Sequence, residues 1–376
     1  MRLVHTDDER LLREAARGFL EQHAPPAALR RLRDARDPDG FSRELWREMA
    51  AMGWAGMLVP EEYGGLGFGH AGAGILCEES GRTLAASPLL ATAILGATLI
   101  RDAGSADQKR RLLPAIAAGE LLCALAVDEC ARHDPAGVAL GARTDGEAFR
   151  LSGDKIFVLD GHVADVLLVA ARTAGAAGET AGISLFVVEA KAAGVAIGRT
   201  VTVDSRNAAI LRLDGARGEL LGALHAGWPA LERTLDIGRI CLAAELVGVA
   251  DAAFARTVDY LKQRRQFGRA IGEFQALQHR AAHLFCELEV ARSAVLHALR
   301  ASDEPGTALA PCASLAKARA GDAARLAVNE ALQMHGGIGM TDEFDIGLFM
   351  KRAAALRQSF GDSYFHIDRY AALQGF

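Results

Sequence analysis

Apolar positions in the first 120 residues recur every three or four places, which is the spacing of one face of an amphipathic helix. Thr6 and Glu9 stand at the spacing of a capping box, so a helix is expected to begin there and to end near Pro25. Ser42 can cap a second helix, and Gly53 should end it. Further helical patterns occupy residues 69–86, 88–103 and 105–118. The first third of the chain is therefore predicted to be helical.

From about residue 121 the spacing of apolar positions becomes shorter, and the chain continues as a series of short runs of residues that favour β-strands. Turn signals such as Asp145-Gly146 and Asp160-Gly161 separate these runs. Short strands at this spacing favour a small antiparallel barrel or sandwich. The runs lie at residues 122–127, 149–151, 155–158, 166–169 and 183–188.

Long helical patterns return after about Trp228. They cover residues 229–261, 272–301 and 308–335, and helices of this length bury their apolar stripes against one another in a bundle. The predicted fold class is α+β, with an N-terminal helical domain, a middle antiparallel β-barrel domain and a C-terminal four-helix bundle. The expected domain boundaries are 1–120, 121–226 and 227–376.

Composition excludes several classes of function. The 376 residues include 42 Lys and Arg against 47 Asp and Glu, so a formal net charge of -5 offers no cationic surface for nucleic acid. The sequence contains no uninterrupted apolar run of about 18 residues, so no membrane association is expected. The acidic start at Asp7-Asp8-Glu9 differs from a signal peptide, which predicts a cytoplasmic protein. The six cysteines include no C-x-x-C pair, and no metal-ligand spacing is present.

Three segments combine glycine, glutamine and charge in patterns that suit close approach to a ligand. The first is Pro60-Glu61-Glu62-Tyr63-Gly64-Gly65-Leu66-Gly67, whose glycines allow positive φ, although an ordinary turn also uses glycine. The second is Arg264-Arg265-Gln266-Phe267-Gly268 with Phe274, Gln275 and Gln278, where a solvated basic patch is the alternative. The third is Gln333-Met334-His335-Gly336-Gly337-Ile338-Gly339, where a helix cap is the alternative.

The α-β-α order and these motifs resemble the acyl-CoA dehydrogenase family over essentially the whole chain. The segments are similar to the family's P-E-x-Y-G-G-x-G, R-x-Q-F-G, F-Q-x-x-Q and Q-x-x-G-G-x-G elements. The resemblance implies FAD bound across a dimer interface, with a forked arginine cation on the pyrophosphate. The cofactor-binding residues that it implies are Arg264, Gln266, Phe267, Gln275, Gln333, Gly336, Gly337 and Asp362.

Asp236 and Arg239 match the family's D-x-x-R, which the resemblance places close to the substrate. The alternative is an ordinary surface ion pair between helical positions i and i+3, worth a few tenths of a kcal/mol. The residues alone leave these two interpretations equal.

The general base that the family reaction needs is missing from its usual positions. The reaction takes a proton from the carbon α to a thioester while a hydride leaves the β carbon for the flavin, so a carboxylate is expected. Phe360 occupies the usual glutamate position, and Gly238 occupies the second position that some members use. Two carboxylates are candidates for a relocated base: Asp362, which stands where the family has a threonine near the flavin, and Glu245. For Glu245 the favoured alternative is a helix charge satisfied by Arg239 or by solvent.

The part of the chain that should face the flavin also departs from the family. Residues 127–134 replace the family's T-E-P-x-A-G-S-D, and the Asp128-Glu129 pair would repel a flavin or CoA phosphate. Leu159 stands where the resemblance implies a threonine hydroxyl bonded to the flavin, and leucine has no donor. The sequence thus keeps the dimer-interface half of the FAD site and loses part of the flavin-ring half.

Two functions remain open. The first is an FAD-dependent acyl-CoA dehydrogenase-like oxidoreductase that carries out α,β-dehydrogenation of an unusual acyl-CoA thioester and passes electrons to electron-transfer flavoprotein. The second is a non-catalytic subunit of a heteromeric acyl-CoA dehydrogenase, which completes a partner's FAD site with Arg264, Gln333 and Gly336-Gly337. A FAD site shared across subunits implies a homodimer, a homotetramer or a heterotetramer with a paralogue.

Overall fold

The computed structural model describes residues 3–146 and 148–376, which form two compact units. The helical unit contains the chain up to Ala35, His70–Ala86 and Arg239–Phe376. The sheet unit contains Arg36–Gly69 and Ser87–Gly238. The division into three domains at residues 1–120, 121–226 and 227–376 stays a prediction.

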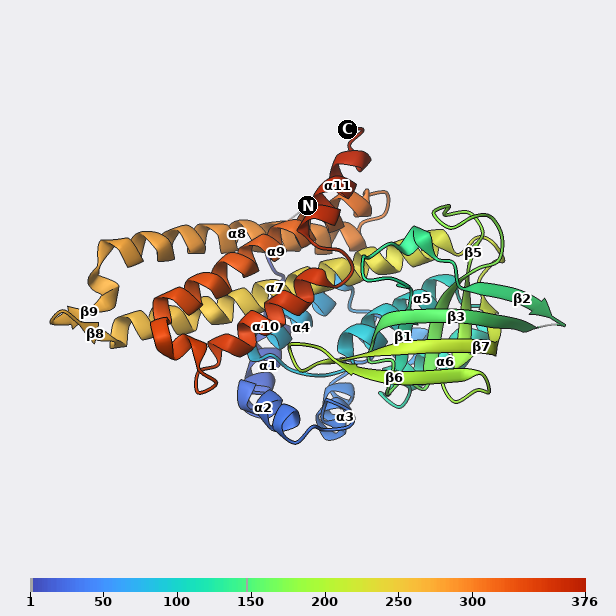
Figure 1. Cartoon of the computed structure of the whole chain (residues 1–376), viewed down its shortest axis with the longest axis horizontal. Helices are drawn as coiled ribbons and strands as arrows, with labels where there is room; N and C mark the ends of the chain where they lie inside the picture. The colour runs from blue at the N-terminus through green and yellow to red at the C-terminus, as the bar shows by residue number, and fades with distance from the viewer. Residues whose placement is uncertain (1–2, 147) are drawn as a thin grey trace. The chain divides into compact units, whose positions relative to one another are not determined.

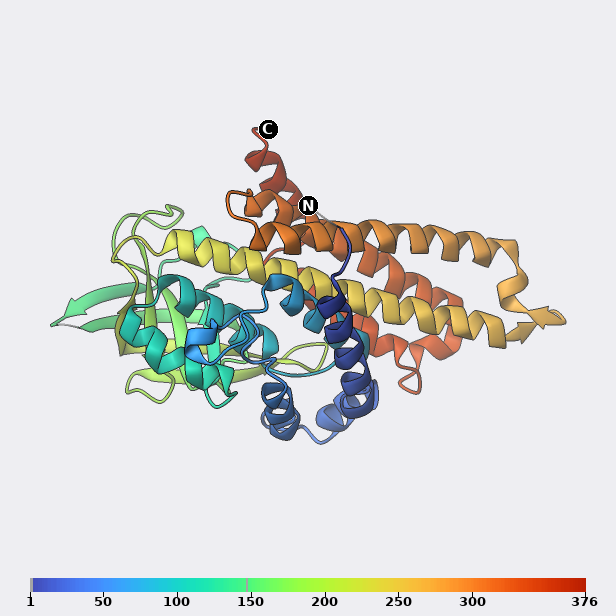
Figure 2. The ribbon, with the colours of Figure 1, turned by 180° about the vertical axis from the view of Figure 1, so that it is seen from behind.

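Long helices dominate the helical unit, and they run side by side (Figures 1 and 2). They are α7 (Trp228–Gln263), of which the part from Arg239 belongs to this unit, α8 (Gln275–Asp303), α9 (Leu309–His335) and α10 (Ile346–Gln358). A hairpin of β8 (Arg265–Gln266) and β9 (Arg269–Ala270) joins α7 to α8 at one end (Figure 1). The other elements are α1 (Asp7–His23), α2 (Pro26–Asp34), α4 (His70–Thr83), η4 (Ile271–Glu273), η5 (Gly336–Met340) and α11 (Ser363–Leu373).

Helix α9 packs against α8, α10 and α11. Its buried face is built mainly of alanine, and these short side chains let neighbouring helices approach closely. The buried alanines include Ala313, Ala316, Ala320, Ala324, Ala327 and Ala331. The predicted helical bundle is confirmed.

Helix α1 begins and ends as predicted. Thr6 Oγ1 accepts a hydrogen bond from the Glu9 amide at 3.2 Å, and Glu9 Oε2 accepts one from the Thr6 amide at 3.1 Å, which completes the capping box. Helix α2 was not predicted. It begins at Pro26 itself, because proline suits the first helical turn, where its missing N–H has no partner to lose.

The sheet unit is built on one seven-stranded sheet with the order β1-β4-β2-β3-β7-β5. Strand β4 also pairs with β5, which closes the sheet into a barrel, and β6 pairs with β7. The pairings are antiparallel except β1 with β4 and β2 with β4. The strands are β1 (Cys123–Ala126), β2 (Gly141–Asp145), β3 (Ala148–Leu159), β4 (Val166–Arg172), β5 (Ile183–Glu189), β6 (Val195–Val201) and β7 (Asn207–Leu221). The predicted middle barrel is confirmed, with two parallel pairings added.

Strands β2, β6 and β7 were not predicted. The period of a strand is present in β7, because Leu211 and Leu213 are buried while Arg212 and Asp214 are exposed. Strand β6 is mostly exposed and pairs on one side only, so its residues carry little burial pattern.

The sheet unit also contains short helices. Ser42 caps the first of them as predicted, because its side chain accepts the Leu45 amide at 3.2 Å. No helix in residues 3–146 or 148–376 is long and apolar enough to cross a membrane. The helices are α3 (Arg43–Ala51), η1 (Glu61–Tyr63), the π-helix η2 (Leu89–Gly96), α5 (Ala97–Ala103) and α6 (Ala106–Ala117).

Candidate functional site

The hairpin between α7 and α8 carries the first group of predicted cofactor residues. Arg264, Gln266, Phe267 and Gln275 are all exposed, and Phe267 is 92% exposed. The backbone of Phe267 has a φ of 52°, and its ring meets Phe274 edge-on at 6.2 Å. A bulky aromatic residue held at positive φ with its side chain in solvent is typical of a binding site. The hairpin is therefore available to a ligand or to a second chain.

The end of α9 carries the second group, Gln333, Gly336 and Gly337. Gln333 is exposed, and a Cβ added at either glycine would meet nothing within 4 Å, so this end of the helix borders open space. His335 is a packed residue: its Nδ1 lies 2.7 Å from the Ala331 carbonyl oxygen, and its ring stacks on Tyr260 with 4.4 Å between centroids.

The stack of Tyr260 on His335 brings the two groups to one end of the helical unit. Tyr260 lies in the last turn but one of α7, and the Arg264 amide donates to its carbonyl oxygen at 2.8 Å. Arg264 therefore begins the hairpin one turn beyond the tyrosine that contacts the end of α9. The predicted cofactor residues other than Asp362 thus gather from two separate stretches of sequence.

The Phe360 segment, Ser359–Asp362, links α10 to α11 and contains the position of the missing base. Phe360 is buried, and Arg239 Nε donates to its carbonyl oxygen at 3.2 Å. Asp362 caps α11, because its Oδ1 accepts the Phe365 amide at 2.9 Å. The structure therefore brings Arg239 and the Phe360 segment together.

Asp236 and Arg239 are both buried, at 2% and 1% exposed. The alternative of a solvent-exposed surface ion pair is therefore wrong, since neither side chain reaches water. Their role in binding substrate stays a prediction.

Glu245 is committed to an ion pair. Its Oε1 accepts from Arg352 Nη1 at 3.1 Å, and both side chains are almost fully buried. Breaking a buried pair of this kind by removing one partner is strongly destabilising, which is typical of a structural role. The geometry favours the structural alternative for Glu245, with Arg352 as a buried partner.

Two further buried donors contact the Phe360 segment, and the sequence did not single them out. Lys317 Nζ donates to the carbonyl oxygens of Gly361 at 3.0 Å and Arg357 at 3.2 Å. His366 Nε2 lies 3.1 Å from the carbonyl oxygen of Phe360. The signal for Lys317 was its place on the apolar stripe of α9, in register with the alanines of that face.

The acidic residues of the predicted flavin-facing loop have hydrogen-bond partners within the sheet unit. Glu129 Oε1 accepts from the fully buried Lys155 Nζ at 2.7 Å, and the Glu129 carboxylate also accepts the amides of Ala139 and Leu140. Asp128 Oδ1 lies 2.8 Å from His133 Nδ1. Burial lowers the pKa of Lys155 to about 8, while Glu129 opposes the shift. The Lys155 cation weakens the expected repulsion of a phosphate by Glu129, while Asp128 is hydrogen-bonded to an imidazole.

The glycine-rich loop at residues 60–67 folds against its own chain. A Cβ on Gly65 would lie 2.0 Å from the Val59 carbonyl oxygen, so no side chain fits there. The amides of Leu66 and Gly67 donate to the carbonyls of Gly56 and Val59. Packing within the sheet unit is enough to require glycine at position 65, and the predicted approach to a ligand is not needed to explain it.

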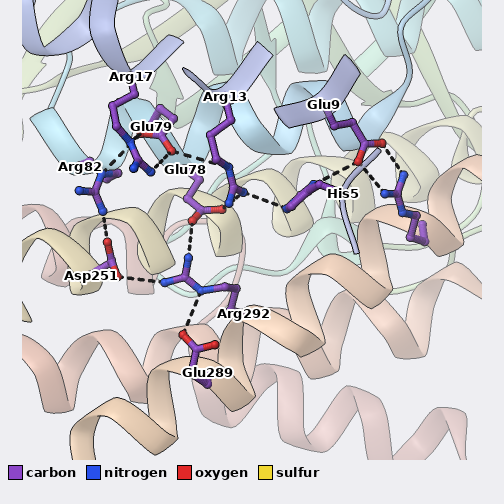
Figure 3. Close-up of polar contacts among 11 residues, drawn as sticks. His5, Glu9, Arg13, Arg17, Glu78, Glu79, Arg82, Asp251, Glu289 and Arg292 are labelled. Carbon is purple, nitrogen blue, oxygen red and sulfur yellow. Dashed lines mark hydrogen bonds and ion pairs between the residues drawn. The ribbon is translucent and has the colours of Figure 1, made fainter. Parts of the chain in front are cut away.

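A large polar cluster of the helical unit lies among α1, α4, α7 and α8, and we call it the ion-pair network (Figure 3). Arg17 forks onto the buried Glu79, with Nε–Oε2 at 3.0 Å and Nη2–Oε1 at 2.8 Å. Arg13 and Arg292 both reach Glu78 at 3.0 Å. None of the predicted site residues belongs to this network, which joins four helices. Its members are His5, Glu9, Arg13, Arg17, Glu78, Glu79, Arg82, Asp251, Glu289, Arg292 and Arg300.

Comparison with known proteins gives one consistent family. Residues 6–120, 123–214 and 225–372 match the family models for the N-terminal, middle and C-terminal domains of acyl-CoA dehydrogenase. The chain is 32% identical over 355 residues to a 3-(aryl)acrylate reductase of Clostridium sporogenes, with 92% of each chain covered.

Solved structures agree with this result. Butyryl-CoA dehydrogenase from Megasphaera elsdenii is similar with a TM-score of 0.91 and 28% identity, over 100% of both chains. A steroid ACAD variant named Tcur3481-Tcur3483 is similar with a TM-score of 0.89 and 33% identity, over 98% of both chains.

Proposed function

The chain belongs to the acyl-CoA dehydrogenase family, and from this premise we propose that it is an FAD-dependent oxidoreductase that dehydrogenates an acyl-CoA thioester between its α and β carbons. Electron-transfer flavoprotein is the proposed electron acceptor. The observation that carries the proposal is the gathering of exposed Arg264, Phe267 and Gln333 at one end of the helical unit. These are the residue types that hold FAD in the resemblance.

The residues at this end fit the diphosphate and nucleotide part of FAD. Arg264 offers a forked cation for the pyrophosphate, and Gln275 and Gln333 offer amide groups that can orient the nucleotide. Gly336 and Gly337 leave the space beside the end of α9 open. When bound, FAD supplies the hydride acceptor. The proposed work of this chain's residues is to bind and orient it.

Asp362 is the proposed base, because its carboxylate has a spare oxygen. Oδ1 caps α11, whereas Oδ2 has no hydrogen bond among the described residues. An Asp362→Asn variant keeps the cap, since asparagine also accepts the amide, but it cannot take a proton. If Asp362 is the base, this variant should retain flavin and lose orders of magnitude in turnover. Equal turnover in the variant and the natural protein would remove Asp362 from the mechanism.

The visible absorbance spectrum of the protein purified with FAD supplied tests the cofactor. A stoichiometric flavin band is the expected result, followed by reduction of an artificial acceptor with some member of a broad acyl-CoA panel. The panel should include aryl and steroid thioesters, because relatives that carry those names are similar to this chain. A colourless protein would count against an enzyme that works alone.

A second candidate is a non-catalytic subunit of a heteromeric acyl-CoA dehydrogenase. Phe360 at the base position and Leu159 at the donor position favour it, because such a subunit needs neither a base nor a flavin donor of its own. Co-expression with a paralogue from the same organism should then restore activity that the isolated chain lacks. Arg264→Ala in this chain should abolish that activity, while Arg265→Ala on the same hairpin should not. An unchanged rate with Arg264→Ala would eliminate this candidate.

The assembly and location follow the same proposal. A FAD site shared between subunits needs at least a dimer, so a homodimer, a homotetramer or a heterotetramer with a paralogue is proposed, in the cytoplasm. Light scattering of the purified chain with and without its paralogue measures the assembly directly.

A further inference from the structure

The Phe360 segment has an unfavourable backbone. Phe360 has a φ of 55° and Gly361 a φ of 101°, both in the region that L side chains rarely adopt. A Cβ on Gly361 would lie 2.3 Å from Phe365 Cδ1, so only glycine fits there. A bulky residue persists at positive φ only where its surroundings over-determine the conformation, and such positions gather at functional sites.

Side chains from three helices fix this conformation through main-chain carbonyl groups. Arg239 Nε of α7 and His366 Nε2 of α11 both lie within hydrogen-bond distance of the Phe360 carbonyl oxygen, at 3.2 and 3.1 Å. Lys317 Nζ of α9 donates to the carbonyl oxygens of Gly361 and Arg357. Arg357 lies in the last turn of α10, where carbonyls have no partner within the helix, so Lys317 also caps α10. We call these three donors and their acceptors the carbonyl cluster.

His366 contributes as a neutral imidazole. Because Nε2 faces a carbonyl oxygen, it carries the proton, and Nδ1 is left to accept from the Ser314 hydroxyl at 3.5 Å. Arg369 Nη1 donates to the same hydroxyl oxygen at 3.1 Å. Burial and the cations Lys317, Arg239 and Arg369 lower the pKa of His366 to about 2, which agrees with the neutral form.

The buried charge of Lys317 is retained at a cost. Lys317 is 2% exposed, and burial together with Arg239 and Arg357 lowers its pKa to about 7, against the opposing effect of Asp362. A methionine would fill the same space without that cost, but it would leave buried carbonyls without donors.

We propose that Lys317 and His366 are positioning residues which, with Arg239, hold the Phe360 segment, at the place where the family's base is expected, in the conformation described above. The inference rests on the proposed function, because only that function makes the Phe360 segment part of an active site. Its test does not require turnover. Neither residue is expected to touch substrate or flavin. Both act through the carbonyls of the segment.

Hydrogen exchange measured by mass spectrometry tests the proposal on the full-length chain. The reporters are the amides of Ser359, Phe365 and His366, which are bonded to Ala355 O, Asp362 Oδ1 and Asp362 O. Lys317→Met and His366→Leu remove donors and should speed exchange in residues 355–367 at least tenfold. His366→Gln keeps an N–H near the position of Nε2 and should restore exchange to within threefold of the natural chain. Lys351→Met, an exposed lysine on α10, is the matched control and should change nothing.

Unchanged exchange in Lys317→Met and His366→Leu would overturn the proposal. Equal acceleration of exchange in every peptide would also overturn the proposal, because it would show global destabilisation alone. Exchange that stays fast in His366→Gln would overturn it as well. If Lys317→Met does not fold, the pair His366→Leu and His366→Gln decides the question. If the protein is purified without bound FAD, the proposed function is contradicted, but the exchange results still test the positioning role. Unchanged exchange in a protein with bound FAD would defeat the positioning role alone.

Discussion

The ion-pair network and the carbonyl cluster are two buried polar regions of the helical unit that balance their charge differently. In the network, guanidinium groups meet carboxylates, as Arg17 meets Glu79 and Arg292 meets Glu78 (Figure 3). In the carbonyl cluster, Lys317 donates only to uncharged main-chain oxygens among the described residues.

This difference separates two roles for buried charge. A carboxylate that meets arginines from different helices holds those helices together, and its loss leaves several cations unpaired at once. A cation on a carbonyl holds one short stretch of backbone, and its loss releases only that stretch. The network is therefore expected to govern global stability, and the carbonyl cluster to govern the local conformation of the Phe360 segment.

The largest effect is expected from Glu79→Gln in the network. Glu79 is 1% exposed and is bonded by both nitrogens of the Arg17 fork, with Arg82 Nε at 3.5 Å. The amide keeps the shape and removes the charge, so the guanidinium groups of Arg17 and Arg82 lose a buried charged partner. We expect the free energy of unfolding to fall by about 3 kcal/mol. Urea denaturation followed by circular dichroism measures it.

The control for this change is Glu289→Gln, which alters charge by the same amount at the rim of the network. Glu289 is 49% exposed and pairs with Arg292 at 3.4 Å, so its loss should cost less than about 1 kcal/mol. Similar losses of unfolding free energy in Glu79→Gln and Glu289→Gln would mean that burial of the carboxylate does not determine how much an ion pair of the network stabilises the fold.

Gly361→Ala should produce the next largest loss, this time in the carbonyl cluster. The new methyl group would lie 2.3 Å from the Phe365 ring, and the φ of 101° is unfavourable for alanine. Overpacking and backbone strain together should cost about 1–3 kcal/mol. Gly347→Ala on α10 is the control, because its Cβ meets nothing within 4 Å and alanine favours a helix. A Tm at or above the natural value for Gly361→Ala would contradict the described backbone.

The distance in sequence between two interacting residues decides how well the sequence predicts their contact. Local signals were sufficient for the capping box of Thr6 and Glu9 and for the cap at Ser42, because both partners lie within one helical turn. The Arg264 and Gln333 motifs were sufficient to recognise the family, while the roles of their residues in binding FAD stay predictions. Glu245 pairs with Arg352, which lies far away in the sequence, and Lys317 donates to a carbonyl oxygen beyond the end of α10. The packing of the helices determines such partners. A main-chain carbonyl acceptor gives no signal in the sequence, because every residue type has one.

A smaller effect is expected from acid, through His366. Burial lowers its pKa in the folded chain to about 2, whereas the unfolded chain takes up the proton near 6.5. The stability that neutral His366 contributes is therefore full above pH 6.5 and is lost as the pH falls from 6.5 toward 2. This residue alone should remove about 1 kcal/mol between pH 7.5 and 5.5. Urea denaturation of His366→Gln should show that its free energy of unfolding falls between the two pH values by about 1 kcal/mol less than that of the natural chain. Equal losses in the two proteins would contradict a buried neutral His366.

The smallest effect is expected from His5, the imidazole of the ion-pair network. Its Nδ1 lies 3.1 Å from Glu9 Oε2, and its Nε2 lies 3.0 Å from Arg13 Nη2, so the neutral ring donates to one neighbour and accepts from the other. Burial, followed by Arg13, lowers the pKa of His5, and acid below pH 6.5 therefore weakens this contact in the same direction as for His366. Because the side chain is partly exposed and the network keeps its other pairs, the cost should be a few tenths of a kcal/mol. Exchange of the Glu9 and Arg10 amides should rise by no more than about threefold between pH 7.5 and 5.5, after correction for intrinsic rates, and His5→Gln should abolish that rise. A larger rise that spreads to α4 and α8 would mean that His5 controls the whole network, and the two regions would then differ less than their contacts indicate.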